Sequence, residues 1–210
     1  MFKRVVGSEE ELRGMYGLPS ERAVLKQLAR IDDHFRAFIA RSPFLLLATS
    51  NAAGQCDVSP KGDMPGFVHV LDDHHLAIPD RPGNKRLDGM TNILENPHVG
   101  LIFLVPGQEH TLRVNGRAWI VRDDDMLDRF IVNGKRPVTA LGVQVEEAYL
   151  HCPKAFKRSG IWDTSQWPDA GAVPSMAQTM WDQLPTRPAG IASVEEYHRD
   201  QEARALKTLY

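Results

Sequence analysis

The stretch 76–105 constrains the fold most, because it places three polar residues where a predicted strand passes into a predicted helix. Residues 76–78 read as the end of a strand, a turn rich in Pro and Gly follows, and apolar residues then recur at helical spacing until Pro97. We therefore predict a helix that begins near Asn84. Its free N–H groups and the positive end of its dipole would lie beside two cationic side chains. This arrangement is typical of a phosphate monoester site, with Asn84, Lys85 and Arg86 as ligands.

The alternative is that Lys85 and Arg86 are two solvated charges at the start of a helix. It is less favoured, because cations at that end of a helix oppose its dipole. A negatively charged ligand between them would remove the conflict.

Strands with short connections dominate the middle of the sequence. Residues 44–48 form a continuous apolar run and residues 56–61 alternate, with a turn between them, which predicts a hairpin. Residues 67–71 and 76–78 predict a second hairpin. Further strands are predicted at 99–105, 111–121 and 138–146. Six or seven strands joined mostly by hairpins predict a mainly β fold with flanking helices, a small antiparallel barrel.

Helices are predicted on both sides of this barrel. Ser8 and Glu11 have capping-box spacing, and an apolar stripe from Ser20 to just before Pro43 predicts one longer helix that packs on the barrel. Beyond the strands, an extended arm is predicted at 159–174 and helices at 123–132, 175–183 and 194–209. The predicted organisation is N-terminal helices at 1–42, a core at 43–158, and an arm with helices at 159–210.

The composition argues against several partners. A formal net charge of −2 with scattered Lys and Arg gives no basic footprint for nucleic acid or an anionic membrane. No apolar run approaches the roughly 18 residues of a spanning helix, and the start lacks a signal peptide, so we expect a cytoplasmic protein.

Cys56 and Cys152 form neither a disulfide framework nor a zinc spacing, and His74 and His75 are adjacent, so no metal site is predicted.

Four segments resemble the FMN-binding split-barrel family typified by pyridoxamine 5'-phosphate oxidase. They are FLLLATSNAAGQCDVSPKGD at 44–63, the GNKR turn and its continuation at 83–107, TLRVNGRAWI at 111–120, and HCPKAFKRSGIW at 151–162. The resemblance implies a split β-barrel that holds FMN, with the flavin phosphate on the turn at 84–86. The family motif and the physical-chemical argument therefore place the phosphate on the same residues. The sequence looks most similar to an FMN-dependent subgroup of unassigned substrate, so the resemblance implies the cofactor better than the reaction.

The resemblance also implies further flavin contacts. The strand at 57–61 would lie along the flavin, where Lys61 could stabilise negative charge on the reduced ring. Thr111 stands where pyridoxamine 5'-phosphate oxidases have a glutamine that reaches the flavin, and Trp162 would cover the ring or a substrate. Arg81 departs from the family pattern. The predicted contacts are Val58, Ser59, Lys61, Ile78, Pro79, Arg81, Asn84, Lys85, Arg86, Thr111, Arg113, Arg158, Ser159 and Trp162.

Four of these flavin contacts have a simpler alternative. Lys61 could be a solvent-facing lysine in a turn, and Thr111 and Arg113 could belong to a polar exterior face of the barrel. Trp162 could anchor a core or a dimer interface.

We expect an FMN-dependent oxidoreductase that acts on a small organic substrate or a reduced nicotinamide. The C-terminal Arg-x-x-His pattern of true pyridoxamine 5'-phosphate oxidases is not recognisable, so that activity is not expected. No catalytic acid or base is predicted, because the flavin itself carries the chemistry. Two alternatives remain: a non-catalytic flavin protein that serves as a redox sensor or flavin store, and a split barrel that binds haem or a deazaflavin. The resemblance further implies a homodimer with each flavin between subunits and with part of 159–210 on the partner.

Overall fold

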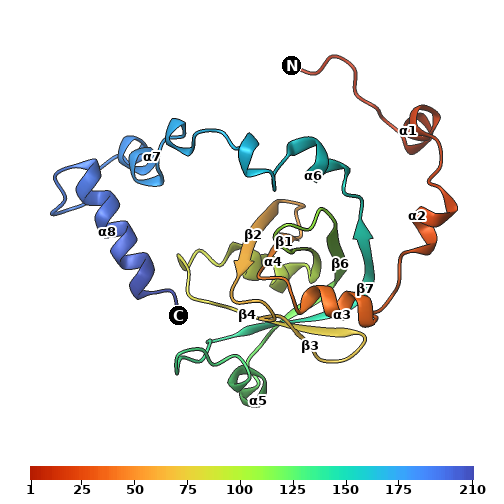
Figure 1. The fold of residues 1–210 in the computed structure, drawn as a ribbon, viewed down its shortest axis with the longest axis horizontal. Coiled ribbons are helices and arrows are strands. Elements are labelled where there is room, and N and C mark those ends of the chain that lie inside the picture. The colour runs from red at the N-terminus through yellow and green to blue at the C-terminus, as the bar shows by residue number, and fades with distance from the viewer.

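A seven-stranded antiparallel sheet forms the centre of the protein (Figure 1). The computed structural model describes residues 1–210, apart from the side chain of Ala170. The strand order is β2-β1-β5-β6-β7-β4-β3. The strands are β1 Phe44–Ser50, β2 Cys56–Gly62, β3 His69–Val70, β4 His75–Pro79, β5 His98–Leu104, β6 Thr111–Val121 and β7 Ala140–His151. This arrangement confirms the predicted mainly β fold with flanking helices.

The hairpins follow from turn chemistry and strand alternation. β1 pairs with β2 in the register Ala48↔Val58, and Gly54 supplies the left-handed residue of the turn between them. The β6–β7 pair is the longest and contains a register shift between Asn115 and Gly116. A Cβ atom on Gly116 would lie 2.0 Å from the Gln144 carbonyl oxygen, so only glycine fits this irregularity.

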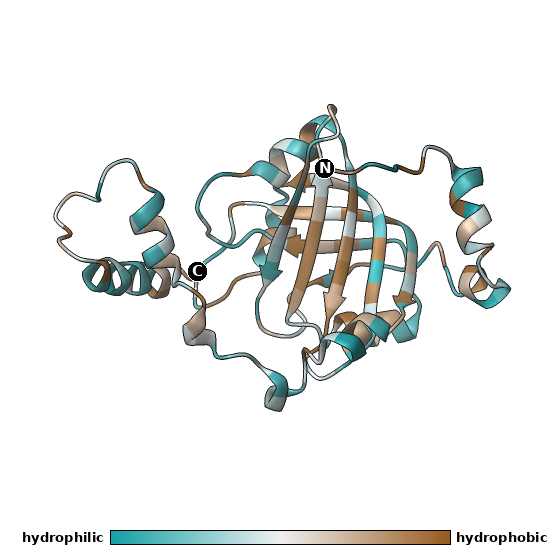
Figure 2. Cartoon of the chain, turned by 90° about the horizontal axis from the view of Figure 1, so that it is seen from above, coloured by the Kyte–Doolittle hydropathy of each residue, from teal (hydrophilic) through white to brown (hydrophobic). Residues whose placement is uncertain are grey.

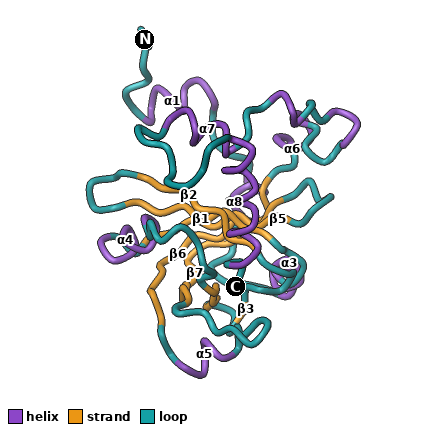
Figure 3. The backbone as a smooth tube through the Cα atoms, turned by 90° about the vertical axis from the view of Figure 1, so that its left-hand side faces the viewer, coloured by secondary structure: helices purple, strands orange, loops and turns teal.

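The core is the inner face of the curved sheet. Figure 2 shows hydrophobic residues as brown bands along the strands. Leu45 on β1, Leu101 on β5 and Leu112 on β6 are fully buried, and each alternates with residues on the opposite face. Helix α3 (Asp33–Ile39) adds Phe35 and Ile39 to this core. Helix α4 (Asp88–Glu95) adds Ile93 to the same core and lies across the strands from α3 (Figure 3).

The prediction of one helix between Ser20 and Pro43 was wrong. The chain forms α2 (Glu21–Leu25), then extends so that Leu28 exchanges two backbone hydrogen bonds with Ala148 of β7, and only then forms α3. Asp32 caps α3 by accepting a hydrogen bond from the N–H of Phe35. The free edge of β7 thus competes with the helix for the backbone groups near Leu28.

The helices before and after the barrel extend away from it on opposite sides, and the chain returns toward the barrel after α8 (Figure 1). Helix α1 (Glu9–Tyr16) begins at the predicted Ser8 cap. After β7 come α6 (Lys154–Ser159), two short 3₁₀ helices, α7 (Met176–Gln183) and α8 (Val194–Lys207). Helices α7 and α8 pack on each other through Trp181 and Tyr197, whose ring centres are 6.2 Å apart. None of the described helices is long and apolar enough to cross a membrane.

Candidate functional site

A cleft of about 830 Å³ lies between β2, the end of β4, the segment before α4 and the start of β7. This volume is within the range of about 300–1,000 Å³ that is usual for small-molecule sites. Six basic and two acidic side chains line it, so the lining favours an anionic ligand over a cationic one. Arg81 and Arg136 are also paired with carboxylates outside the lining. The basic residues are Lys61, Arg81, Lys85, Arg86, Lys135 and Arg136, and the acidic ones are Asp80 and Asp88.

The turn before α4 forms one wall of the cleft. Lys85 and Leu87 have φ values of 62° and 60°, a left-handed conformation that is uncommon for residues other than glycine. Such residues cost roughly 1–3 kcal/mol each and gather at functional sites. Asn84 Oδ1 accepts a hydrogen bond of 3.1 Å from the N–H of Arg86, which stabilises the turn. Turns of this kind orient successive N–H groups toward an anion.

Helix α4 begins at Asp88, so the prediction of a helix start near Asn84 was wrong by four residues. The cause is the left-handed backbone of Lys85 and Leu87, which cannot continue a right-handed helix. Gly89 and Met90 in the first turn of α4 still line the cleft, so the positive end of the helix dipole does reach it. Arg86 Nε donates to Asp88 Oδ2 at 2.7 Å, and this hydrogen bond raises the pKa of Arg86.

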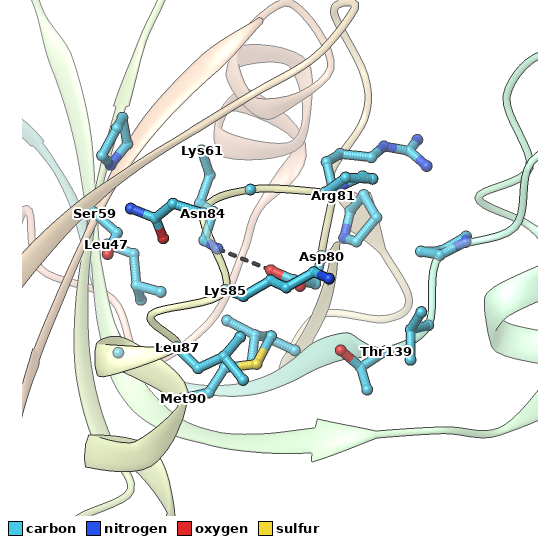
Figure 4. A pocket seen from close by; sticks show the side chains of 18 of the residues that line it. Leu47, Ser59, Lys61, Asp80, Arg81, Asn84, Lys85, Leu87, Met90 and Thr139 are labelled. Carbon is cyan, nitrogen blue, oxygen red and sulfur yellow. Dashed lines mark hydrogen bonds and ion pairs between the residues drawn. The ribbon is translucent and has the colours of Figure 1, made fainter. Parts of the chain in front are cut away.

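Two ion pairs organise the middle of the cleft. Nζ of Lys61 lies 3.0 Å from Oδ1 of Asp80, and both side chains are 22% exposed. Figure 4 shows this pair between Leu87 and Met90 on the α4 side and Arg81 and Thr139 on the other. Lys61 is therefore not the solvent-facing lysine of the alternative reading. Asp80 neutralises its charge in the free cleft.

Arg81 forms the second pair, with Nε 2.7 Å from Oδ2 of Asp63. Its Nη1 also donates to the Phe130 carbonyl at 2.9 Å. With these partners Arg81 is a fixed wall of the cleft. The remaining predicted residues on its lining are Ser59 on β2 and Pro79 at the end of β4.

Sequence reasoning missed the opposite wall. Lys135, Arg136, Thr139 and Tyr210 line the cleft although they are far from the motif at 83–86 in the sequence. The pairing of β7 with β4 in the register Pro79↔Ala140 brings 135–139 to the cleft. A run of two cations before Pro137 is a weak sequence signal, and nothing in the sequence indicates Tyr210.

Half of the predicted flavin contacts do not line this cleft. Ile78 is fully buried in the core. Val58 points to the outer face of β2, away from Ser59 and Lys61. Strand register places Arg113 on that same outer face, through the row Pro60–Leu46–Ile102–Arg113.

The other predicted residues outside the cleft lie at the start of β6 and on the segment that follows β7. Thr111 is buried at the first position of β6. Arg113 Nη1 donates to the Tyr149 hydroxyl at 3.2 Å, and Nε1 of Trp162 donates to the Gln108 carbonyl at 2.8 Å. Arg158 and Ser159 lie exposed on α6. The structure thus divides the predicted residues into a cleft group, a buried Ile78, and an outer-face group. We use the last name for Val58 and Arg113 on the outer sheet face together with Thr111, Arg158, Ser159 and Trp162.

The fold and the cleft define a small β-barrel protein with a cleft lined by basic side chains. The family model described as pyridoxamine 5'-phosphate oxidase matches residues 31–152, more than half of the chain. The chain belongs to this family, and its fold is the split barrel of that family. The matched region begins before the predicted core boundary of 43, because it includes α3.

Several solved structures are similar to this chain. A protein of Lactobacillus delbrueckii, provisionally assigned as a pyridoxamine 5'-phosphate oxidase, is 23% identical over 59% of this chain and 98% of its own, with a TM-score of 0.47. An F420 reductase is 19% identical over 58% and 98%, with a TM-score of 0.40. The haem storage protein HutZ of Vibrio cholerae is 20% identical over 56% and 91%, with a TM-score of 0.39. No curated protein matches the chain.

Proposed function

We propose that the protein binds FMN in the cleft and acts as an oxidoreductase on a small organic substrate or a reduced nicotinamide. The observation that carries this proposal is the left-handed turn at Lys85 and Leu87, which sets cations and backbone N–H groups on the wall of a basic cleft in a member of this family. The donor set fits a phosphate monoester, and the cleft volume fits a molecule of this size.

Each residue of the cleft group has a definite task in this proposal. Lys85, for which the described part of the chain offers no ion pair, would bind the phosphate directly, and Arg86 would exchange Asp88 for it. Lys61 and Asp80 would lie beside the ring, where Lys61 stabilises negative charge and Asp80 limits the effect. When bound, FMN supplies the hydride and electron transfer chemistry, and the protein supplies orientation and electrostatics.

We also propose a homodimer in which the outer-face group of one subunit completes the cleft of the other. The outer sheet face exposes apolar side chains, with Val58 62%, Ile102 39% and Phe44 38% exposed. Arg113 lies in this face, with Thr111 at its border and Trp162 on the neighbouring segment. A second copy on this face would bury the apolar residues and bring the outer-face group toward a flavin. Such a protein would work in the cytoplasm.

The cofactor is tested by the absorption spectrum of the purified protein. An oxidised flavin spectrum, released as FMN on denaturation, supports the proposal. A Soret band or a deazaflavin spectrum would replace it with one of the two alternative cofactors. A flavin that no electron donor reduces would favour the sensor or store.

The homodimer is tested by light scattering on the wild type and on Ile102→Asp. A charge in the middle of the outer face should produce a monomer that loses FMN affinity. Leu94→Asp is the matched control, because Leu94 is exposed on α4 away from that face. A wild-type monomer that holds stoichiometric FMN would refute the dimer while leaving the cofactor assignment intact.

A further inference from the structure

The last residue of the sequence lies in the cleft. Tyr210 follows α8, and its hydroxyl donates a hydrogen bond of 2.7 Å to Oδ1 of Asp63. The Arg81 guanidinium lies 5.3 Å from the centre of the Tyr210 ring, within cation–π range. A main-chain oxygen of Tyr210 accepts a hydrogen bond of 2.7 Å from Nζ of Lys135. Contacts from three separate segments therefore hold this one residue.

Asp63 is the anchor of this arrangement. It follows β2, its side chain is only 3% exposed, and it accepts hydrogen bonds of 2.7 Å from Nε of Arg81 and from the N–H of Met64. Burial alone raises the pKa of Asp63, but hydrogen bonds from Tyr210, Met64 and Arg81 outweigh burial and hold the pKa below its ordinary value. The Tyr210 hydroxyl thus meets an ionised, fixed acceptor, and the hydrogen bond is charge-assisted.

The bound hydroxyl decides what Tyr210 offers to a ligand. Because its oxygen is engaged by Asp63, the side chain contributes its ring to the cleft lining. Pro137 and Val138 also line the cleft. With Tyr210 they add aromatic and aliphatic surface to a lining that is otherwise rich in basic side chains. Such a surface suits a planar ring, which can pack on the tyrosine, and the surplus of basic side chains in the lining favours a ring that carries a carboxylate.

We propose that Tyr210 is a specificity-determining residue whose ring closes the Arg81 side of the cleft and limits the size of the planar aromatic carboxylates that bind there. This proposal rests on the proposed function in one respect, because the ligand would be the substrate that shares the cleft with the cofactor. In Figure 4 the Lys61–Asp80 pair separates Arg81 and Thr139 from Leu87 and Met90. The Arg81 side of the cleft is therefore separate from the α4 end. The α4 end receives the phosphate, and Tyr210 sets the limit on the other side.

Binding of benzoate, naphthoate and anthracenecarboxylate to the full chain tests this assignment. The three acids share one charge and increase only in ring size. Measured by equilibrium dialysis, with and without FMN, the wild type should bind the largest acid at least about fivefold more weakly than benzoate, because the added rings would overpack against Tyr210. Tyr210→Ala should abolish this difference and weaken benzoate about two- to tenfold through lost ring contact.

Two further variants make the result specific. Tyr210→Leu keeps a bulky side chain, so it should retain the size limit but bind benzoate as weakly as Tyr210→Ala. Tyr16→Ala should behave as the wild type, because Tyr16 is exposed on α1. If the wild type binds none of the acids, or if Tyr210→Ala keeps the full size discrimination, the assignment is overturned.

The failure of the proposed function is distinguishable in the same samples. FMN binding is read from the flavin spectrum, and acid binding is read from dialysis. Size discrimination that depends on Tyr210 in a protein without FMN affinity would refute the flavin function and support the role of Tyr210. Normal FMN binding with discrimination independent of Tyr210 would refute the role of Tyr210 alone.

Discussion

Replacement of Arg86 by methionine should weaken FMN binding about tenfold and leave riboflavin binding unchanged. Arg86 is 72% exposed and already donates to Asp88, so a phosphate would replace one anionic partner with another. A hydrogen bond to a charged group contributes about 1.5–3 kcal/mol, and the exposure of this pair argues for the lower end. About 1.4 kcal/mol corresponds to a factor of ten in affinity.

The opposite perturbation is Asp88→Asn, which releases Arg86 and removes a negative charge beside the phosphate. Two unit charges about 5 Å apart in water interact by roughly 0.8 kcal/mol, so FMN affinity should rise about fourfold. The same change removes a favourable carboxylate from the first turn of α4, which should cost about 0.3–1 kcal/mol of stability. Tighter binding and a lower melting temperature are therefore expected together.

Paired titrations with FMN and riboflavin, followed by quenching of flavin fluorescence, measure these effects. Arg122→Met is the matched control, because Arg122 is an exposed arginine outside the cleft lining. Equal losses for both flavins in Arg86→Met would refute the phosphate assignment. Weaker FMN binding in Asp88→Asn would refute the proposed exchange of partners.

Three further predictions concern the cleft. Lys61→Met should lower the flavin midpoint potential in a photoreduction titration, and Asp80→Asn should raise it, because the two charges oppose each other. Each 1.4 kcal/mol corresponds to about 30 mV. Shifts of the same sign in the two variants would contradict this prediction. Asp63→Asn should lower the melting temperature by about 6–12 °C, from roughly 3 kcal/mol for a broken buried pair. Because folding lowers the pKa of Asp63, this stabilisation is present above about pH 4 and is lost as pH falls through the folded value, so the two melting curves should converge in acid. Leu87→Gly should raise the melting temperature by about 2–4 °C by relieving a left-handed residue, whereas Leu94→Gly within α4 should lower it.

Features that depend on neighbouring residues were predictable from the sequence alone. Strand alternation and turn residues predicted the β1–β2 hairpin, and the spacing of Ser8 and Glu11 predicted the start of α1. Lys85 and Arg86 were likewise correctly placed between a strand and a helix, although the helix begins four residues later than predicted. These predictions succeed because they depend on local properties of the chain. Such properties are the hydrogen bonds that span four residues or fewer and the period of side-chain burial.

Contacts between distant segments were decided only by the tertiary structure. The free edge of β7 interrupts the expected helix at Leu28, since strand pairing at Ala148 competes for the same backbone groups. Asp80 neutralises Lys61, a partner that no sequence spacing indicates. Tyr210 reaches the cleft because Asp63, buried at the end of β2, holds an ionised carboxylate that needs donors. Local periodicity thus determined the elements, while burial and charge compensation across the fold determined which residues form the cleft.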